Sequence, residues 1–395
     1  MVVKLYVMKL LTPQRVSTYC VVIIATHLVA LTIWPERGYA VGGDFRAFYN
    51  AGRIFNEQPH DHLYDVSLQD ALYESQGGDK NESLPFVYAP WFVLPFALLA
   101  RLSYVGAYLL WTILSISLLS VGYVLTARVL AIRSDWCLAG LLAALAFAPF
   151  QLFTIRGGQT SAFGFAVIAL AFFLYFTERP ISAGLALAFV LYKPPLLLLL
   201  LPMLIIVGQW RVLIGFAVGA IALALLSLAL VRVAGVAGYF EILRLFYSAG
   251  NAQTEIFPTW RYVDIGAAFR LLTGYPAGML RFVLVAVALP FLWRAWRRDR
   301  GGRLSWALSI AGTLLFSLYS PIYDATLLIL AVMWAGPKQI GDRVLVGLFV
   351  LSFITVGVAS VTKVQLFTIA LCWLTWQIYS LLGFPSRPLI QTKNY

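Results

Sequence analysis

The stretch I181-S-A-G-L-A-L-A-F-V-L-Y-K-P-P-L-L-L-L-L-L-P-M-L-I-I-V207 decides the fold class, because it is almost entirely apolar and holds a single charged residue, Lys193. About 20 apolar residues suffice for a helix that crosses a bilayer. Pro194 and Pro195 interrupt helical hydrogen bonding, so two short helices are predicted with Lys193 at their junction. An ionisable side chain in a membrane segment costs about 2.5–3.5 kcal/mol or more. We therefore expect Lys193 to line a cavity or to meet a partner; the alternative is that it snorkels to the lipid headgroups.

The composition extends this reading to the whole chain. Of 395 residues, 61% are hydrophobic and 12% are charged, whereas soluble domains are about 45–50% apolar and 25% charged. A single integral membrane domain over residues 1–395 is predicted. The net charge of +12 fits basic cytoplasmic loops and anionic membrane lipids, so no nucleic-acid partner is expected. The cysteines match neither a disulfide framework nor a metal spacing.

The apolar runs predict an all-α polytopic protein with roughly 11–13 transmembrane helices. The expected spans are 16–34, 104–127, 136–153, 159–176, 181–192, 195–208, 211–231, 278–296, 303–320, 322–336, 343–361 and 363–382. The run 88–102 is interpreted as an interfacial or re-entrant piece. A full span there would reverse the next spans and place Arg128 and Arg133 outside, against the positive-inside rule.

Two loops are expected on the extracytoplasmic face of the cytoplasmic membrane. The first, residues 35–87, follows the first span and carries interfacial helices. Nine of the 17 acidic residues lie between Trp34 and Pro85, together with four basic ones, which suits an outward-facing segment. The second loop covers residues 232–277. Its polar and aromatic residues include Trp260 and Arg261, which we expect to line a substrate cavity.

The first loop begins with V41-G-G-D-F-R-A-F-Y-N-A-G52, in which Asp44 precedes a helix with an aromatic face. One interpretation makes Asp44 the N-cap of that helix. The other places an amphipathic helix on the membrane surface and holds Asp44 over the mouth of a cavity, where a carboxylate could act as general base.

Further polar motifs are expected on the same face. Arg156-Gly-Gly-Gln159 offers a cation and two glycines that permit close backbone approach. Arg156 could be a plain loop residue, but together with Lys193 it suggests a site for an anion such as phosphate. Tyr192, Gln159, Tyr323 and Asp324 are predicted to line the cavity. Asp324 could equally cap a helix.

Other chemistries lack support in the sequence. His60 and His62 are interpreted as solvated loop residues, so no metal site is expected and no cofactor is predicted. The chain has no Walker A, GxGxxG, HExxH or GxSxG pattern, which argues against soluble nucleotide chemistry.

An ordered set of short motifs resembles glycosyltransferase family 87. The set reads Gly43-Asp44-Phe45, Phe48-Tyr49, Ala51-Gly52, Leu63-Tyr64-Asp65, Phe86, Tyr88-Ala89-Pro90, Pro95, Gly158-Gln159, Ala183-Gly184, Lys193-Pro194, Ser320-Pro321 and Tyr323-Asp324. The resemblance covers most of residues 40–335. No single motif is specific to the family, but the order and spacing of the motifs together form a strong signal.

The resemblance implies a GT-C-like bundle with an outward-facing active site and a polyprenyl-phosphate-linked sugar donor, mannose by default. Asp44 would be the catalytic base and Lys193 would approach the donor phosphate, while the acceptor would be a lipid or a glycan. After Ser-Pro this chain reads I-Y-D-A-T, where some relatives carry histidines. The stretch therefore departs from the family pattern, and the resemblance assigns no role to Asp324.

The residues agree with this chemistry and leave one rival class. Displacing a lipid phosphate from a sugar carbon needs one base and charge stabilisation of the leaving phosphate, which predicts single displacement with inversion. The rival is a transporter or flippase of a lipid-linked or anionic solute, with Lys193 and Arg156 in discontinuous helices. A ligase or polymerase of similar topology would often carry its large loop nearer the C-terminus.

Overall fold

The computed structural model describes residues 11–33, 43–76, 84–251, 258–317 and 319–383. Within these residues every regular element is a helix, and the one isolated β-bridge joins Tyr262 to Pro321. The protein is an all-α polytopic membrane protein, as the apolar runs predict. A purely helical chain satisfies its backbone hydrogen bonds internally, which the bilayer interior requires.

The segment predicted as the first external loop folds into a small group of helices, named the outer cap here after that prediction: α3 (Phe45–Glu57), η1 (His60–Tyr64) and α4 (Val66–Ser75). The aromatic face of α3 is buried, and the Phe48 ring stacks on Phe96 with 4.8 Å between centroids. Phe96 belongs to α5 (Leu94–Leu99), which follows η3 (Pro90–Val93). The expected interfacial run 88–102 thus holds two short helices, below the length of about 20 residues that a full span needs.

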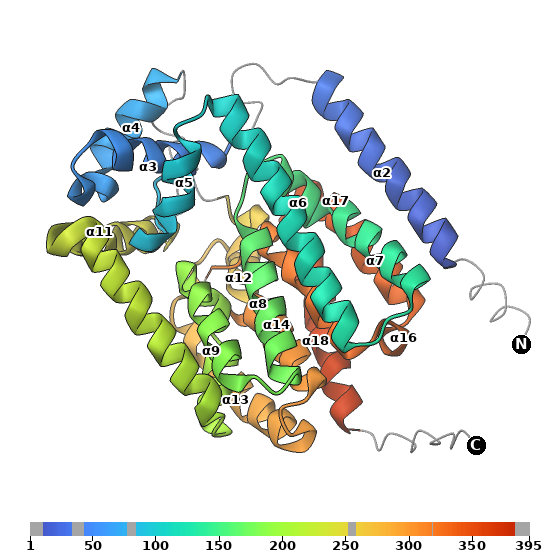
Figure 1. Ribbon diagram of the computed structural model, residues 1–395. Helices are drawn as coiled ribbons and strands as arrows, with labels where there is room; N and C mark the ends of the chain where they lie inside the picture. The colour runs from blue at the N-terminus through green and yellow to red at the C-terminus, as the bar shows by residue number, and fades with distance from the viewer. Residues whose placement is uncertain (1–10, 34–42, 77–83, 252–257, 318, 384–395) are drawn as a thin grey trace, which may run out of the picture.

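Helix α2 (Pro13–Ile33) precedes the cap in the chain. After α5 come α6 (Tyr104–Val129), α7 (Ser134–Ala146), the π-helical turn η4 (Pro149–Ile155) and α8 (Ser161–Phe176). Helix α2 packs on α7, and α6 packs on α8 (Figure 1). The predicted span 136–153 is bent, since α7 and η4 meet at 52°.

The stretch around Lys193 forms broken helices, as its prolines predict. The chain runs through α9 (Pro180–Ala188), η5 (Phe189–Tyr192), η6 (Pro194–Leu197) and α10 (Leu200–Ile206). Lys193 itself has a non-helical backbone (φ −140°, ψ 79°). Helix α9 packs closely on α11, because a Cβ at Gly184 would lie 1.9 Å from the Val212 carbonyl oxygen.

Helix α11 (Trp210–Asn251) extends beyond the expected span 211–231. At Arg232 the backbone leaves helical geometry (φ 57°, ψ −174°), and the helix resumes in a new direction. The portion beyond the bend runs beneath the outer cap (Figure 1), where the Tyr239 ring lies 5.4 Å from Tyr64. The start of the predicted second loop, 232–277, is therefore helical.

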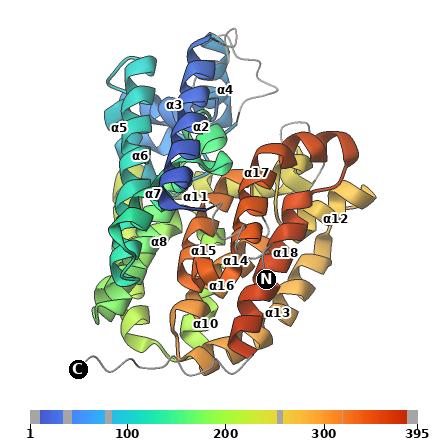
Figure 2. The same ribbon diagram turned by 90° about the vertical axis from the view of Figure 1, so that its right-hand side faces the viewer.

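A second group of helices comes from the C-terminal part: η7 (Thr259–Arg261), α12 (Ile265–Thr273), α13 (Gly278–Asp299), α14 (Arg303–Phe316), η8 (Ile322–Leu327), α15 (Leu328–Ala335), α16 (Pro337–Ile340), α17 (Asp342–Thr362) and α18 (Leu366–Gly383). Figure 2 shows this group beside the helices of the N-terminal part. The two groups meet where η8 packs against η4 and α8. That junction lies deep in the molecule, since all six residues of η8 are buried.

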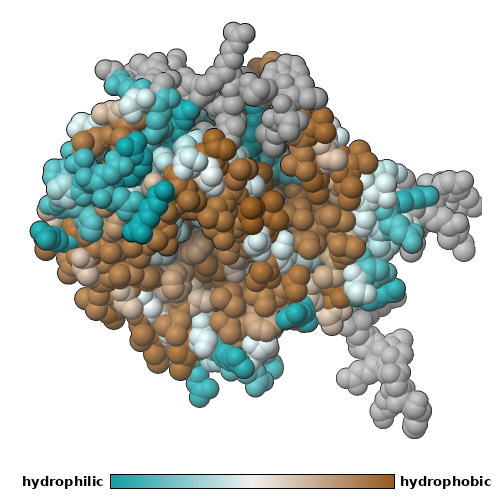
Figure 3. Space-filling model, turned by 45° about the horizontal axis from the view of Figure 1, so that its top comes forward, coloured by the Kyte–Doolittle hydropathy of each residue, from teal (hydrophilic) through white to brown (hydrophobic). Residues whose placement is uncertain are grey.

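The surface suits a bilayer. Figure 3 shows a broad hydrophobic area, with hydrophilic residues gathered over the outer cap and along the opposite edge. Five helices among the described residues are long and apolar enough to cross a membrane, or six if α7 and η4 form one bent span. Five shorter apolar helices accompany them.

Candidate functional site

Asp44 is held by a close backbone contact between the outer cap and the connection from η4 to α8. The backbone N–H groups of Asp44 and Phe45 both donate to the Gly157 carbonyl, at 3.0 and 3.1 Å. The next residue, Gly158, has φ +72°, and a Cβ there would lie 2.5 Å from the Phe45 Cβ. The paired glycines after Arg156 therefore let this connection lie directly against the start of α3.

The Asp44 side chain does not cap its helix. Asp44 is the N-cap residue of α3 by position, but its carboxylate makes no capping hydrogen bond. Instead, the amide of Gln159 donates to the Asp44 Oδ2. Burial raises the pKa of Asp44, while this hydrogen bond and the charge of Arg261 act in the opposite direction. The carboxylate thus stands beside two predicted site residues, with its helix left uncapped by a side chain.

Helix α6 holds the glycine connection in place. The Trp111 indole N–H donates to the Gly158 carbonyl at 3.0 Å, and the Tyr108 hydroxyl donates to the Ile155 carbonyl at 2.7 Å. The Arg156 carbonyl also accepts from Tyr108, at 3.3 Å. The Arg156 side chain is half-buried at the end of η4.

Lys193 meets Asp324 inside the protein. The Lys193 Nζ lies 2.6 Å from the Asp324 Oδ2, and both side chains are buried, 7% and 1% exposed. The Nζ also lies over the rings of Tyr323 and Tyr319, at 4.6 and 5.2 Å from their centroids. Lys193 is thus buried and meets a partner, rather than snorkelling to the headgroups. The partner is a carboxylate, which the sequence did not predict.

Tyrosines connect Asp44 with this ion pair. The Tyr88 ring is parallel to that of Tyr192, 5.9 Å away, and its hydroxyl accepts from Thr160 at 3.5 Å. Tyr88 is within electrostatic reach of both Asp44 and Asp324. The Tyr192 hydroxyl donates to the Thr160 carbonyl at 3.4 Å. Tyr88 was not predicted as a site residue, although it belongs to the motifs that carry the family resemblance.

The segment with Trp260 and Arg261 joins the same region through backbone pairing. The Val263 N–H donates to the Ser320 carbonyl at 2.9 Å, next to the bridge that joins Tyr262 to Pro321. The Arg261 guanidinium lies over the Trp260 ring at 4.8 Å. The Tyr262 ring in turn packs on Tyr319, 5.2 Å away. The segment 258–264 is thereby joined to the Ser-Pro-Ile-Tyr-Asp stretch.

Asp264 has a structural role instead. Its carboxylate accepts from the backbone N–H of Ala267 at 2.8 Å, which caps α12, and from that of Ser320 at 3.3 Å. The Arg281 guanidinium lies 3.7 Å from the same carboxylate. Burial raises the pKa of Asp264, and these three neighbours lower it.

The two histidines of the first loop contact neighbouring protein groups. The His60 ring stacks on Phe55 at 4.0 Å, and its Nδ1 lies 3.1 Å from the Leu230 carbonyl. The His62 ring lies 3.8 Å from the Asp65 carboxylate. Among the residues that the structure describes, no three metal-ligating side chains gather in one place.

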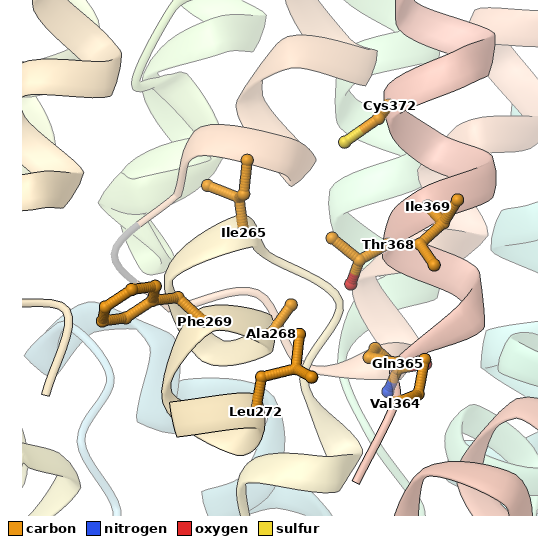
Figure 4. A pocket seen from close by; sticks show the side chains of 9 residues that line it. All are labelled: Ile265, Ala268, Phe269, Leu272, Val364, Gln365, Thr368, Ile369 and Cys372. Carbon is orange, nitrogen blue, oxygen red and sulfur yellow. The ribbon is translucent and has the colours of Figure 1, made fainter. Parts of the chain in front are cut away.

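An apolar cleft of about 240 Å³ lies between α12 and the start of α18 (Figure 4). Its lining side chains are Ile265, Ala268, Phe269, Leu272, Val364, Gln365, Thr368, Ile369 and Cys372. Two of them also hold the segment described above. The Gln365 amide donates to the Trp260 carbonyl at 2.8 Å, and the Thr368 hydroxyl donates to the Val263 carbonyl at 2.9 Å. The cleft therefore borders the backbone that carries Trp260 and Arg261.

A family model matches this chain over residues 86–321, and that family is described as glycosyltransferase family 87. The chain belongs to glycosyltransferase family 87. The matched residues include Gln159, Lys193 and the Trp260–Arg261 segment, whereas Asp44 and Asp324 lie on either side of them. No curated protein and no solved structure matches the chain. Membership makes the protein a membrane glycosyltransferase.

Proposed function

We propose that this family 87 protein transfers a hexose, mannose by default, from a polyprenyl-phosphate donor to a lipid or glycan acceptor. The reaction takes place on the extracytoplasmic face of the cytoplasmic membrane and inverts the anomeric carbon. One observation carries the proposal. Asp44 occupies an N-cap position without capping its helix, its carboxylate accepts from Gln159, and Tyr88, Tyr104 and Tyr262 lie within its electrostatic reach.

Asp44 acts as the general base. The acceptor hydroxyl oxygen attacks the sugar C1 while its proton passes to the Asp44 carboxylate. Burial raises the pKa of Asp44, which strengthens the carboxylate as a base relative to an ordinary aspartate. The amide of Gln159 donates to one carboxylate oxygen and fixes the orientation of the carboxylate. A single displacement needs one base, so no second carboxylate is required.

The leaving group is the lipid phosphate. The bond between C1 and the phosphate oxygen breaks, and its electrons stay with that oxygen, so positive charge nearby lowers the barrier. Lys193 supplies that charge at the break between η5 and η6, with Arg156 as a second cation from the end of η4. Tyr192 and Tyr323 line the path between the base and the phosphate, together with Tyr88.

The polyprenyl chain lies in the apolar cleft between α12 and α18. A hydrocarbon chain needs an apolar lining, and the exposed side chains of Leu272 and Ile369 border the cleft. The cleft also adjoins the backbone of Trp260 through Gln365. This arrangement leaves the phosphate and sugar toward Arg261, whose charge acts on Asp44.

The experiment is the transfer of radiolabelled mannose from polyprenyl-phosphate-mannose to a membrane lipid extract by purified protein. Wild type should label a lipid, and Asp44→Asn should not, while both bind the donor. If neither labels a lipid, the donor sugar is wrong and other polyprenyl-phosphate sugars come next. If Asp44→Asn labels as well as wild type, the assignment of the base fails.

A further inference from the structure

The ion pair between Lys193 and Asp324 joins the two groups of helices. Lys193 lies at the break between η5 and η6, whereas Asp324 lies in η8, which packs against η4 and α8. The two residues are 131 positions apart in the chain and 2.6 Å apart in space. A buried pair of this kind is weak evidence for stability, because desolvation of the two charges offsets much of their attraction.

The surroundings of Lys193 show how its charge is balanced. One carboxylate oxygen contacts the ammonium, and the faces of the Tyr319 and Tyr323 rings lie beside it. The hydroxyls of these two tyrosines are 3.4 Å apart. An ammonium is a compact charge with three donors on a flexible stem, so it can change anionic partners without moving its backbone.

We propose that Asp324 is an internal counter-ion, which occupies Lys193 while no donor is bound and gives way to the phosphate of a polyprenyl-phosphate ligand. This inference rests on the proposed function and deepens it. Carboxylate and phosphate oxygens both accept charge-assisted hydrogen bonds from an ammonium, so one replaces the other without any covalent change. The released carboxylate has the phenols of Tyr88, Tyr192 and Tyr323 within electrostatic reach.

The exchange serves product release. The donor is a phosphodiester with one negative charge, whereas the product is a phosphate monoester that carries about −1.5 to −2 charge at neutral pH. An unopposed buried cation would therefore hold the product more tightly than the donor. Asp324 competes with both ligands for Lys193, and re-formation of the ion pair accompanies departure of the polyprenyl phosphate.

The test measures binding of undecaprenyl phosphate, the product-like probe, to the purified full chain in lipid nanodiscs. Asp324→Asn removes the competing charge, so its Kd should fall about tenfold, or about 1.4 kcal/mol. Lys193→Met should weaken binding about tenfold or more. In the background of Lys193→Met, Asp324→Asn should bring no tightening, because the two substitutions act through one contact. Glu57→Gln breaks an exposed ion pair with Arg53 and should leave binding unchanged.

Turnover provides a readout that a merely structural role would not move. In Asp324→Asn, KM for the donor should fall together with kcat, because the retained product slows release. Asp324→Ser provides a second neutral variant in case the asparagine variant does not fold, and it should tighten binding in the same direction. Asp324→Glu retains the anion and should restore affinity toward that of wild type.

The outcomes separate this inference from the function on which it rests. If wild type binds the probe and transfers sugar, but no folded neutral variant at position 324 binds more tightly, the ion pair is structural and the inference fails alone. If wild type neither binds undecaprenyl phosphate nor transfers sugar from any polyprenyl-phosphate donor, the proposed function fails and the inference fails with it.

Discussion

Asp44 and Asp264 are both N-cap residues by position, but their carboxylates make different contacts. Each directly precedes a helix, α3 or α12. The Asp264 carboxylate accepts from Ala267 and Ser320 and faces Arg281. The Asp44 carboxylate makes no capping bond and accepts from Gln159. An aspartate at a helix start is therefore not always a helix cap, since its carboxylate can bond to a side chain from another part of the fold.

Backbone contacts explain the difference. The Asp44 N–H is bonded to Gly157, and the residue has a helical backbone (φ −78°, ψ −20°). Asp264 has the extended backbone of an ordinary N-cap (φ −74°, ψ 156°), which turns its carboxylate back toward the first helical N–H groups. The Gly157–Gly158 connection thus removes Asp44 from the capping geometry.

Substitution of Asp44 should give the largest effect. Asp44→Asn keeps the size and removes the base, so we expect transfer to fall by about 10²–10⁴-fold with donor binding retained. Stability should not fall. Because burial raises the folded-state pKa of Asp44, its carboxyl group ionises less readily in the folded protein than in the unfolded chain. At neutral pH the ionised carboxylate therefore destabilises the fold, and only below the folded-state pKa does the protonated group stop doing so. Radiolabel transfer and Tm of the same preparations check both points.

Asp65→Asn is the matched control for this experiment. Asp65 lies in the same loop and caps α4 by accepting from the N–H groups of Ser67 and Leu68. Asparagine is an equally good N-cap, so transfer should stay within about twofold of wild type. Equal losses in the two variants would mean that the outer cap merely tolerates no change of charge, and Asp44 would lose its special role.

Asp264→Ala should show the opposite pattern. It removes a helix cap and takes the carboxylate away from the half-buried Arg281, so the free energy of unfolding should fall by about 2 kcal/mol. Thermal unfolding in detergent measures the loss. Asp264→Asn keeps the cap and should recover about 1 kcal/mol of it. A folded Asp264→Ala protein of unchanged Tm that had lost transfer would reverse the roles assigned to the two aspartates.

Gly158→Ala tests whether backbone contact creates the difference. A methyl group there meets the Phe45 Cβ at 2.5 Å, and φ is +72°, so we expect a loss of about 1–3 kcal/mol in stability. Transfer should fall as well, because Asp44 moves away from Gln159. Gly274→Ala is the control, with φ +76° and open space around its Cβ. It should cost only the strain of that backbone, about 1 kcal/mol, and leave transfer unchanged.

Much of the fold is predictable because the bilayer imposes long apolar helices. Helix α6 was expected at 104–127 and occupies Tyr104–Val129, and the break at Lys193 follows from Pro194 and Pro195. The continuation of α11 beyond Arg232 was not predicted. That part is helical because it packs beneath the outer cap, with Tyr239 against Tyr64, and a local hydropathy pattern contains no information on such a contact.

The site is less predictable, because its contacts join residues that lie far apart in the chain. The sequence identifies Lys193 as an unusual charge in an apolar run and Asp324 as a predicted cavity residue, but their contact across 131 residues requires the fold. Arg156 and Lys193 were predicted to converge as two cations on an anion, which stays a prediction, whereas the contact of Lys193 with Asp324 was not predicted. Local sequence also leaves Asp44 equally suited to capping and to catalysis, and the absence of a capping bond becomes visible only in the fold, where its N–H donates to Gly157.

The pH dependence of transfer gives the smallest effect and the sharpest check on the environment of Asp44. Transfer should decline on acidification as Asp44 takes up a proton, with a midpoint above that of an ordinary aspartate, because burial raises its pKa. The Gln159 hydrogen bond and the Arg261 charge both lower that pKa. Gln159→Leu and Arg261→Gln should therefore each move the acidic limb of the kcat/KM profile upward. A limb that stays in place in both variants would mean that the titrating group is not Asp44.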